Sequence, residues 1–162
     1  MPSFNIIAAI GRSGQLGLNG EVPWHEPLDL QHFRALTYGH AVIMGRRTWE
    51  SLKVPLKGRV NLMVSSTHPH PRTLAVDVRP TLDQALYRAA LLECEAWVIG
   101  GAKLYKEALA HKGAGLLFLT RVNYEGPADV FFPMDALCGW SIREDETHQR
   151  GSCIFEVWER TP

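Results

Sequence analysis

The sequence has few cysteines, no excess of charge of either sign and no long apolar run. Its 162 residues include 17 basic and 17 acidic side chains, so the formal net charge is zero. This balance argues against bulk attraction to nucleic acid or to an anionic membrane and favours a small-molecule ligand. The three cysteines, Cys94, Cys138 and Cys153, are widely separated and odd in number, which indicates a reducing compartment rather than a disulfide framework.

Targeting and repeat signals are also missing. No stretch approaches membrane-spanning length, and the apolar run at 4–10 lacks the basic flank of a signal peptide. We therefore expect a soluble cytoplasmic protein. Without repeats, low-complexity segments or a linker, residues 1–162 are expected to form a single domain, which is long enough to bury its own core.

No metal site is predicted. His68 and His70 are two residues apart in the proline-rich segment 67–73, but no cysteine or carboxylate lies near them in the sequence. This pattern is more typical of a solvated loop than of a metal centre.

Short apolar runs rich in β-forming residues alternate with helix-like stretches. The runs occupy 4–10, 40–45, 60–66, 96–100 and 116–122. The intervening helices are predicted over 27–38, 46–52, 82–92 and 102–110. This order predicts an α/β fold with a mostly parallel central sheet flanked by helices. Two further β-like runs within 140–160 surround a turn at Gly151, so a C-terminal antiparallel hairpin should make the sheet mixed.

The glycine-rich segment after the first run resembles a phosphate loop only superficially. Its glycines fall at 11, 14, 17 and 20, which fits neither the dinucleotide fingerprint nor the P-loop. Because these glycines lead into the stiff apolar sequence Val22-Pro23-Trp24, we expect a mobile flap that closes over a ligand.

Two other strand ends look suited to an anion. The segment GRRTW (45–49) places Arg46 and Arg47 at the first turn of a helix, where backbone amides already favour negative charge. The segment VIGGAKLY (98–105) repeats the order of strand, glycine pair and helix. With Ser65 and Ser66 at a further strand end, these segments indicate an extended cofactor such as a dinucleotide, lying along the carboxyl edge of the sheet.

One acid stands where a carboxylate is unexpected. In VPWHEPLDLQHF (22–33), Asp29 has helical spacing to Phe33 and Leu36, on what looks like a core-facing stripe. Desolvation penalises a charge at such a position, so a polar partner or a ligand should compensate it.

These segments together resemble the dihydrofolate reductase family. The resemblance covers nearly the whole chain and is most specific in the succession V-P-W, D-L-x-x-F and V-I-M-G-R-x-T-W-E-S. It implies reduction of dihydrofolate by NADPH, in which a hydride goes to C6 and a proton to N5 of the pterin. It also implies that antifolates bind the site, that the protein acts as a monomer and that the Gly100–Gly101 peptide is cis.

The resemblance assigns roles to individual residues. Asp29 would accept hydrogen bonds from the pterin and, with Trp24, serve the chemistry. Residues implied to bind the substrate are Ile7, Asp29, Leu30, Phe33, Leu52, Leu56, Arg59 and Thr120, with Arg59 gripping the α-carboxylate of the glutamate tail. Residues implied to bind the cofactor are Ala9, Leu16, Gly17, Arg46, Arg47, Thr48, Ser65, Ser66, Ile99, Gly100, Gly101, Lys103, Leu104 and Tyr105.

The chain departs from the family pattern at Ala128-Asp129-Val130, where many relatives have Gly-Asp-Thr in a loop that supports the flap. His25, beside the flap, receives no role and is expected to face solvent. Two alternatives stay open: a pyrimidine reductase of riboflavin biosynthesis with the same fold, and a nucleotide- or antifolate-binding protein without turnover. Arg59 favours the folate enzyme over the first, and Asp29 with Trp24 over the second.

Overall fold

A computed structural model describes residues 2–67 and 75–162. The predicted loop histidines, His68 and His70, lie outside the described residues. The strands are β1 (Phe4–Ile10), β2 (Gln15–Gly17), β3 (Ala41–Gly45), β4 (Val60–Val64), β5 (Asp77–Arg79), β6 (Ala96–Gly100), β7 (Ala114–Arg121), β8 (Val130–Phe131), β9 (Trp140–Ile142), β10 (His148–Arg150) and β11 (Cys153–Arg160). The helices are α1 (Pro27–Thr37), α2 (Arg46–Leu52), α3 (Leu82–Leu91) and α4 (Ala102–Ala110), with short 3-10 turns η1 (Met134–Leu137) and η2 (Glu144–Glu146).

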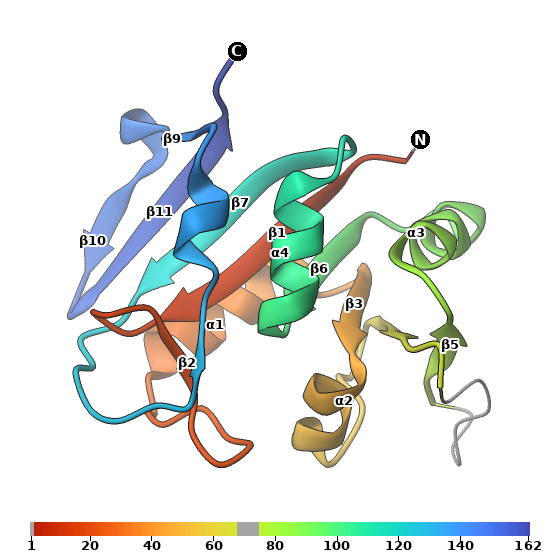
Figure 1. The fold of residues 1–162 in the computed structure, drawn as a ribbon, viewed down its shortest axis with the longest axis horizontal. Helices are drawn as coiled ribbons and strands as arrows, with labels where there is room; N and C mark the ends of the chain where they lie inside the picture. The colour runs from red at the N-terminus through yellow and green to blue at the C-terminus, as the bar shows by residue number, and fades with distance from the viewer. Residues whose placement is uncertain (1, 68–74) are drawn as a thin grey trace.

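The main sheet has the order β10-β11-β7-β1-β6-β3-β4-β5, with β9 paired to β11 (Figure 1). The pairs from β7 to β5 are parallel, and β11 is antiparallel to β7, β9 and β10. The predicted mixed, mostly parallel sheet with a C-terminal hairpin is therefore confirmed. Gly151 has φ +59° in the hairpin turn, a conformation that glycine adopts without steric cost.

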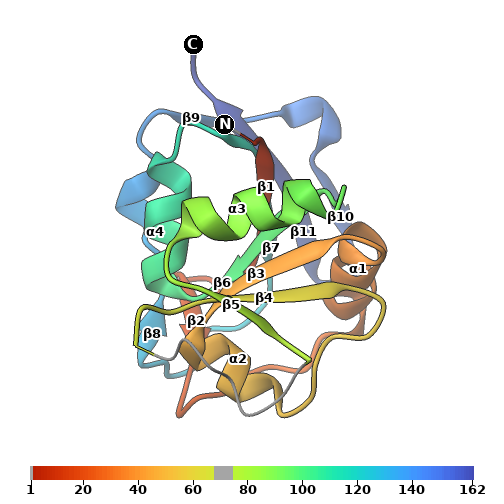
Figure 2. The same ribbon diagram turned by 90° about the vertical axis from the view of Figure 1, so that its right-hand side faces the viewer.

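Helices cover both faces of the sheet (Figures 1 and 2). On one face, alternate strand residues such as Ile6, Ile43 and Val98 pack with α3 and α4 in the main apolar core. The other face carries α1 and the second set of strand residues, including Ile7 and Thr120. The period of two along each strand separates these two sets.

Most element boundaries agree with the sequence analysis to within one or two residues. The predicted helix 27–38 ends at Thr37, and Gly39 follows in a left-handed conformation with φ +84°. β7 begins at Ala114, and β4 ends at Val64, short of the predicted serines. The sequence analysis missed the short strands β2, β5 and β8, because two or three partly exposed residues show no periodic pattern.

The predicted core-facing stripe on α1 is only partly correct. Thr37 is the buried residue of this helix, whereas Phe33 and Leu36 are half-buried. Leu30 is 56% exposed. The helix therefore packs closely on the sheet near its C-terminus and presents its N-terminal half, with Asp29, at an open edge.

Candidate active site

Asp29 is the half-buried carboxylate of the site. It lies in the first turn of α1, where Pro27 occupies an early helical position. Burial raises the pKa of Asp29 and the charge of Glu26 raises it further, while the Thr120 hydroxyl acts in the opposite direction. Among the described residues no cation forms an ion pair with this carboxylate. The negative charge of this side chain is therefore only partly compensated within the described protein, as expected of a group that binds a ligand.

Thr120 is the polar residue nearest this carboxylate on the sheet. It is 1% exposed, and its hydroxyl has no hydrogen bond of ordinary geometry to any described residue. The hydroxyl nevertheless acts to lower the pKa of Asp29, which indicates that the two groups lie near each other. Ala9 of β1 is the register partner of Thr120, which places it beside this pair.

His32, one turn beyond Asp29, does not supply the missing positive charge. Its ring packs on Phe155 with centroids 4.4 Å apart. Burial lowers the pKa of His32, and the charges of His148 and Arg150 lower it further. The imidazole is thereby kept neutral near pH 7, and Asp29 retains its unbalanced charge.

The apolar residues predicted for the substrate come from several elements. Ile7 is buried in β1, while Phe33 and Leu30 lie on α1. Trp24 is half-buried just before α1, and its ring lies 5.4 Å from the ring of Tyr124. His25 is exposed, as expected.

Arg59 is held in a fixed orientation beside the C-terminal end of α1. Its Nε donates to the Lys57 carbonyl at 2.9 Å and its Nη1 donates to Thr37 Oγ1 at 3.2 Å. The guanidinium also lies 5.9 Å from the ring centroids of Phe33 and Tyr38. Burial lowers the pKa of Arg59, and the positive charge of Arg34 lowers it further. Arg59 has no acidic partner among the described residues, so it is available to a carboxylate ligand.

Asn61 was not predicted, but it shapes the loop that carries Leu56 and Arg59. It is 5% exposed and its side chain accepts from Leu56 N at 3.1 Å. Its amide also donates to the Leu56 carbonyl at 3.0 Å and to the Arg59 carbonyl at 3.1 Å. A polar residue within the predicted strand was the available signal, because a buried amide requires several partners.

Tyr105 joins the predicted substrate and cofactor residues. It lies on α4. Its buried hydroxyl is the donor to two carbonyls, that of Ile7 at 2.8 Å and that of Ile99 at 2.7 Å. Burial raises the pKa of Tyr105 and the negative charge of Asp29 raises it further, so the phenol stays protonated. The Tyr105 hydroxyl therefore links the middle of β1 to the end of β6, within electrostatic range of the carboxylate.

Glycines leave an open cradle where β3 and β6 end. A Cβ placed on Gly45 would lie 3.9 Å from the Gly100 carbonyl oxygen, and a Cβ on either Gly100 or Gly101 would lie 3.4 Å from Thr48 Oγ1. The predicted anion-binding segments are therefore adjacent in space. The Gly100–Gly101 peptide is cis, as the resemblance implied.

Other residues predicted for the cofactor lie around this cradle. Arg47, Ser66 and Lys103 are exposed. Arg46 is also exposed and forms an ion pair with Glu50 at 3.4 Å, which offsets its charge at the start of α2. The side chain of Leu104 belongs to the main core, so its contribution to the site is limited to its backbone at the start of α4.

The glycine-rich segment forms a flap against a second, two-stranded sheet. In this sheet β2 pairs with β8, with Gln15 opposite Phe131 and Gly17 opposite Val130. The flap then turns at Asn19 and Gly20, which have φ values of +52° and +81°. Both residues are typical of a tight hairpin turn with left-handed conformations.

Asp129 connects the loop Ala128-Asp129-Val130 to this flap. Its backbone amide donates to the Gly17 carbonyl at 2.9 Å, and its carboxylate accepts from Asn19 N at 3.0 Å. The loop Ala128-Asp129-Val130 thus contacts the flap despite its departure from the family pattern. Its effect on flap motion stays a prediction.

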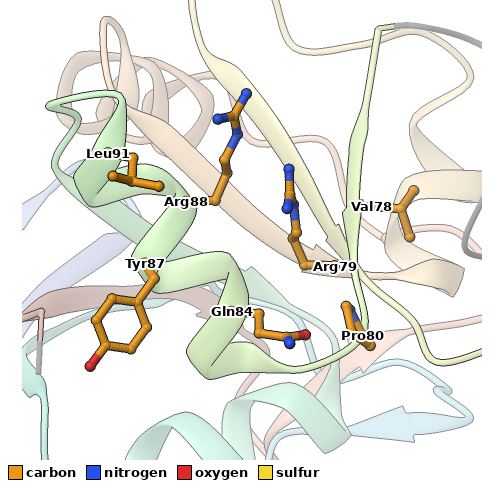
Figure 3. A pocket seen from close by; sticks show the side chains of 7 residues that line it. All are labelled: Val78, Arg79, Pro80, Gln84, Tyr87, Arg88 and Leu91. Atoms are coloured by element: carbon orange, nitrogen blue, oxygen red, sulfur yellow. The ribbon is translucent and has the colours of Figure 1, made fainter.

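A separate hollow of about 360 Å³ lies between β5 and α3 (Figure 3). Its lining residues are Val78, Arg79, Pro80, Gln84, Tyr87, Arg88 and Leu91, none of which was predicted for the site. Arg79 and Arg88 both bind Asp77, at 2.7 and 2.8 Å. Burial acts to raise the pKa of Asp77, but the hydrogen bonds and charges of the two arginines outweigh it and lower the pKa. The two arginines that line this hollow are therefore already paired with a carboxylate.

Among residues 2–67 and 75–162, no group of three or more histidine, cysteine or acidic side chains could hold a metal ion. In the same part of the chain, no helix has the length and apolar character needed to cross a membrane.

The fold and this site define a class: an α/β protein with a ligand site along the carboxyl edge of its sheet and a half-buried acid at one end of it. Comparison with known proteins identifies the family. The family model described as dihydrofolate reductase matches residues 3–160. The chain therefore belongs to the dihydrofolate reductase family.

Individual relatives agree with this assignment. The chain is 43% identical over 145 residues to dihydrofolate reductase type 3 of Salmonella typhimurium, covering 89% of this chain and 86% of the relative. It is 34% identical over 142 residues to dihydrofolate reductase of Bacillus subtilis (strain 168), covering 88% of this chain and 82% of the relative. A solved dihydrofolate reductase from Enterococcus faecalis, complexed with NADP(H) and RAB-propyl, has a TM-score of 0.85 at 25% identity and covers 99% of this chain and 97% of its own.

Proposed function

We propose that this chain catalyses the NADPH-dependent reduction of 7,8-dihydrofolate to 5,6,7,8-tetrahydrofolate and so supplies one-carbon metabolism. The observation that carries the proposal is the half-buried Asp29, whose pKa burial raises and whose carboxylate forms no ion pair with a cation in the described parts of the chain. A planar heterocycle with adjacent N–H groups would satisfy this carboxylate through two hydrogen bonds. Family membership supports this reading over the pyrimidine reductase of the same fold.

The pterin would lie between Asp29 and the end of β1. The ring would be bounded by Ile7, Phe33 and Trp24. The buried Thr120 hydroxyl, which has no hydrogen-bond partner among the described residues, would complete the polar contacts beside the acid. Because burial raises its pKa, the Asp29 carboxyl group holds a proton more readily than a solvent-exposed aspartate does. Asp29 would therefore favour protonation at N5, either directly or by orienting water.

The rest of the substrate would extend toward the opposite end of α1. Leu30, Leu52 and Leu56 would contact the aminobenzoyl ring. Arg59, already oriented by the Thr37 hydroxyl and the Lys57 carbonyl, would take the α-carboxylate of the glutamate tail. A planar guanidinium matches a carboxylate through paired hydrogen bonds, which an ammonium group cannot reproduce.

The glycine cradle fits a dinucleotide, because side chains on Gly45, Gly100 and Gly101 would occupy the space at the ends of β3 and β6. Bound NADPH supplies the hydride for C6 of the substrate. The phosphates of NADPH would be held by Arg46, Arg47, Thr48, Ser65, Ser66 and Lys103. Of these residues, Arg46 and Ser66 would favour the 2′-phosphate. The nicotinamide end of NADPH would be bordered by Ala9, Leu16, Gly17, Ile99, Leu104 and Tyr105.

Much of the rate enhancement would come from positioning and from exclusion of water. Tyr105 holds the carbonyls of Ile7 and Ile99 together where the two ligands would meet. The flap, supported by Asp129, would cover this junction and keep bulk water from the reacting atoms.

The test is a turnover assay that follows the loss of NADPH absorbance with dihydrofolate as substrate. Turnover that depends on both compounds is expected, and an antifolate should inhibit it. Tight binding of both ligands without any loss of absorbance would instead indicate a binding protein.

We also propose that the enzyme acts as a monomer in the cytoplasm. A dimer in sedimentation equilibrium would contradict the monomeric state.

A further inference from the structure

We propose that Tyr124 is a positioning residue for the reaction, which orients the indole of Trp24 and connects it to the base of the flap. This proposal rests on the proposed function, in which Trp24 borders the pterin. It starts from the contact between the two rings, whose centroids are 5.4 Å apart with planes inclined by 51°. Aromatic pairs favour such inclined geometries over face-to-face stacking.

Trp24 needs an external support of this kind. It lies between the flap and α1, outside any helix or strand, and is half-buried. Within the described part of the chain, Tyr124 is the one aromatic ring in contact with it, and its indole makes no hydrogen bond. No helix or strand fixes the backbone at this position, so the contact with Tyr124 contributes to the choice among the rotamers of the indole.

Tyr124 itself is held firmly at several atoms. Its hydroxyl donates to the Pro127 carbonyl at 2.5 Å, which closes a small turn within the loop. The ring lies across Gly126, where an added Cβ would come within 2.6 Å of the hydroxyl oxygen. Its carbonyl accepts from Arg12 N at 2.8 Å, and its amide donates to the Val122 carbonyl at 2.8 Å. The ring is therefore a rigid surface for the indole.

The loop that carries Tyr124 is also fastened to the flap base. Arg12 Nε donates to Asn123 Oδ1 at 2.7 Å, and Ser13 Oγ donates to Glu125 Oε1 at 2.5 Å. The buried Gln15 donates from Nε2 to the Gly126 carbonyl at 3.2 Å. The flap thus leaves this loop at residues 12–15 and returns to it at Trp24, with Tyr124 as the contact at the returning end.

This arrangement gives Tyr124 a role in catalysis through Trp24. A change in the tilt of the indole alters the wall against which the pterin is placed, and hydride transfer is sensitive to small misplacements. The residue touches neither reacting atom, so its effect should appear in the turnover step more than in substrate affinity.

A double-mutant cycle tests the proposal. Tyr124→Ala should lower kcat by about 5- to 10-fold with little change in the KM for dihydrofolate, the loss expected for one aromatic pair. Tyr124→Phe keeps the ring and should stay within about twofold of the wild type. In a Trp24→Phe background, the Tyr124→Ala substitution should cost much less, because the two residues would act through one contact.

Matched controls separate this role from a general structural one. Tyr87→Ala removes an exposed tyrosine on α3, remote from Asp29, and should leave kcat unchanged. If Tyr124→Ala folds poorly, Tyr124→Leu preserves apolar volume without the ring and takes its place in the cycle. The ligand-induced change in tryptophan fluorescence, measured against the Trp24→Phe protein as blank, reports the surroundings of this indole and should differ between the wild type and Tyr124→Ala.

The outcomes are distinct. Equal losses from Tyr124→Ala in the two backgrounds, or unchanged kcat and fluorescence, would overturn the positioning role. A wild-type protein that fails to oxidise NADPH with dihydrofolate would overturn the proposed function instead. A loss that Tyr124→Phe shares in full would assign the effect to the hydroxyl bond with Pro127 and would also contradict the proposal.

Discussion

Replacing Asp29 by asparagine should make the protein more stable at neutral pH while nearly abolishing turnover. The substitution keeps the shape of the side chain and removes its charge. In the folded protein, burial and the charge of Glu26 raise the pKa of Asp29 above its ordinary value of 3.8, against the smaller opposing effect of Thr120. The folded state therefore binds this proton more tightly than the unfolded chain does.

The sign of the effect follows from this linkage. The stability contributed by this group is full below pH 3.8 and is lost as the pH rises through the folded-state pKa. At pH 7 the charged form remains and destabilises the fold. Because the carboxylate is half-buried and partly solvated, we expect asparagine to recover only about 1 kcal/mol, which is a rise in Tm of ~2 to 4 °C for a chain of this size.

Thermal unfolding of the ligand-free proteins at several pH values between about 4 and 8 measures this difference, with exposed Asp145→Asn in η2 as the control. The gain should shrink as the pH falls. Turnover at pH 7 should fall by roughly 10²- to 10³-fold, since the group that favours protonation at N5 is lost. A variant that is less stable at pH 7, or whose gain is independent of pH, would refute the account of Asp29 as an uncompensated charge.

Three further predictions concern the tail, the cradle and the thiols. Arg59→Lys should raise the KM for dihydrofolate about tenfold and leave the Kd for NADPH unchanged, because one paired contact is lost; an unchanged KM would remove the tail assignment. Gly45→Ala should fold normally, since the new Cβ meets its neighbours at 3.9 Å, yet weaken NADPH binding in a titration; equal affinity would move the cofactor elsewhere. Burial raises the pKa of Cys153 to about 11, so alkylation followed by mass spectrometry should modify exposed Cys138 and spare Cys153 in the native protein; rapid labelling of Cys153 would contradict its burial.

The strands of the central sheet could be predicted because their signal is local. β1, β3 and β6 are continuous runs of apolar residues, and each precedes a turn or helix start that the sequence marks with glycine. The same local reasoning failed for β5, whose three partly exposed residues gain their structure only by pairing with β4. A strand of this length has too few residues to show a period.

The candidate site was predicted unevenly for a similar reason. Asp29 and Arg59 stand within distinctive motifs, so the resemblance found them. Asn61 and Tyr124 stand in no such motif, and their roles come from contacts that only folding creates: amide bonds around a loop, and a ring against an indole distant in sequence.

The sequence alone determined the alternation of strands and helices and the presence of an unusual acid, because hydrophobic period and turn chemistry act between near neighbours. The tertiary structure alone decided that the Tyr105 hydroxyl bonds to carbonyls of both β1 and β6 and that Gly45 faces Gly100. The order in which strands pair depends on the packing of the whole sheet. That order brings the ligand-binding groups together.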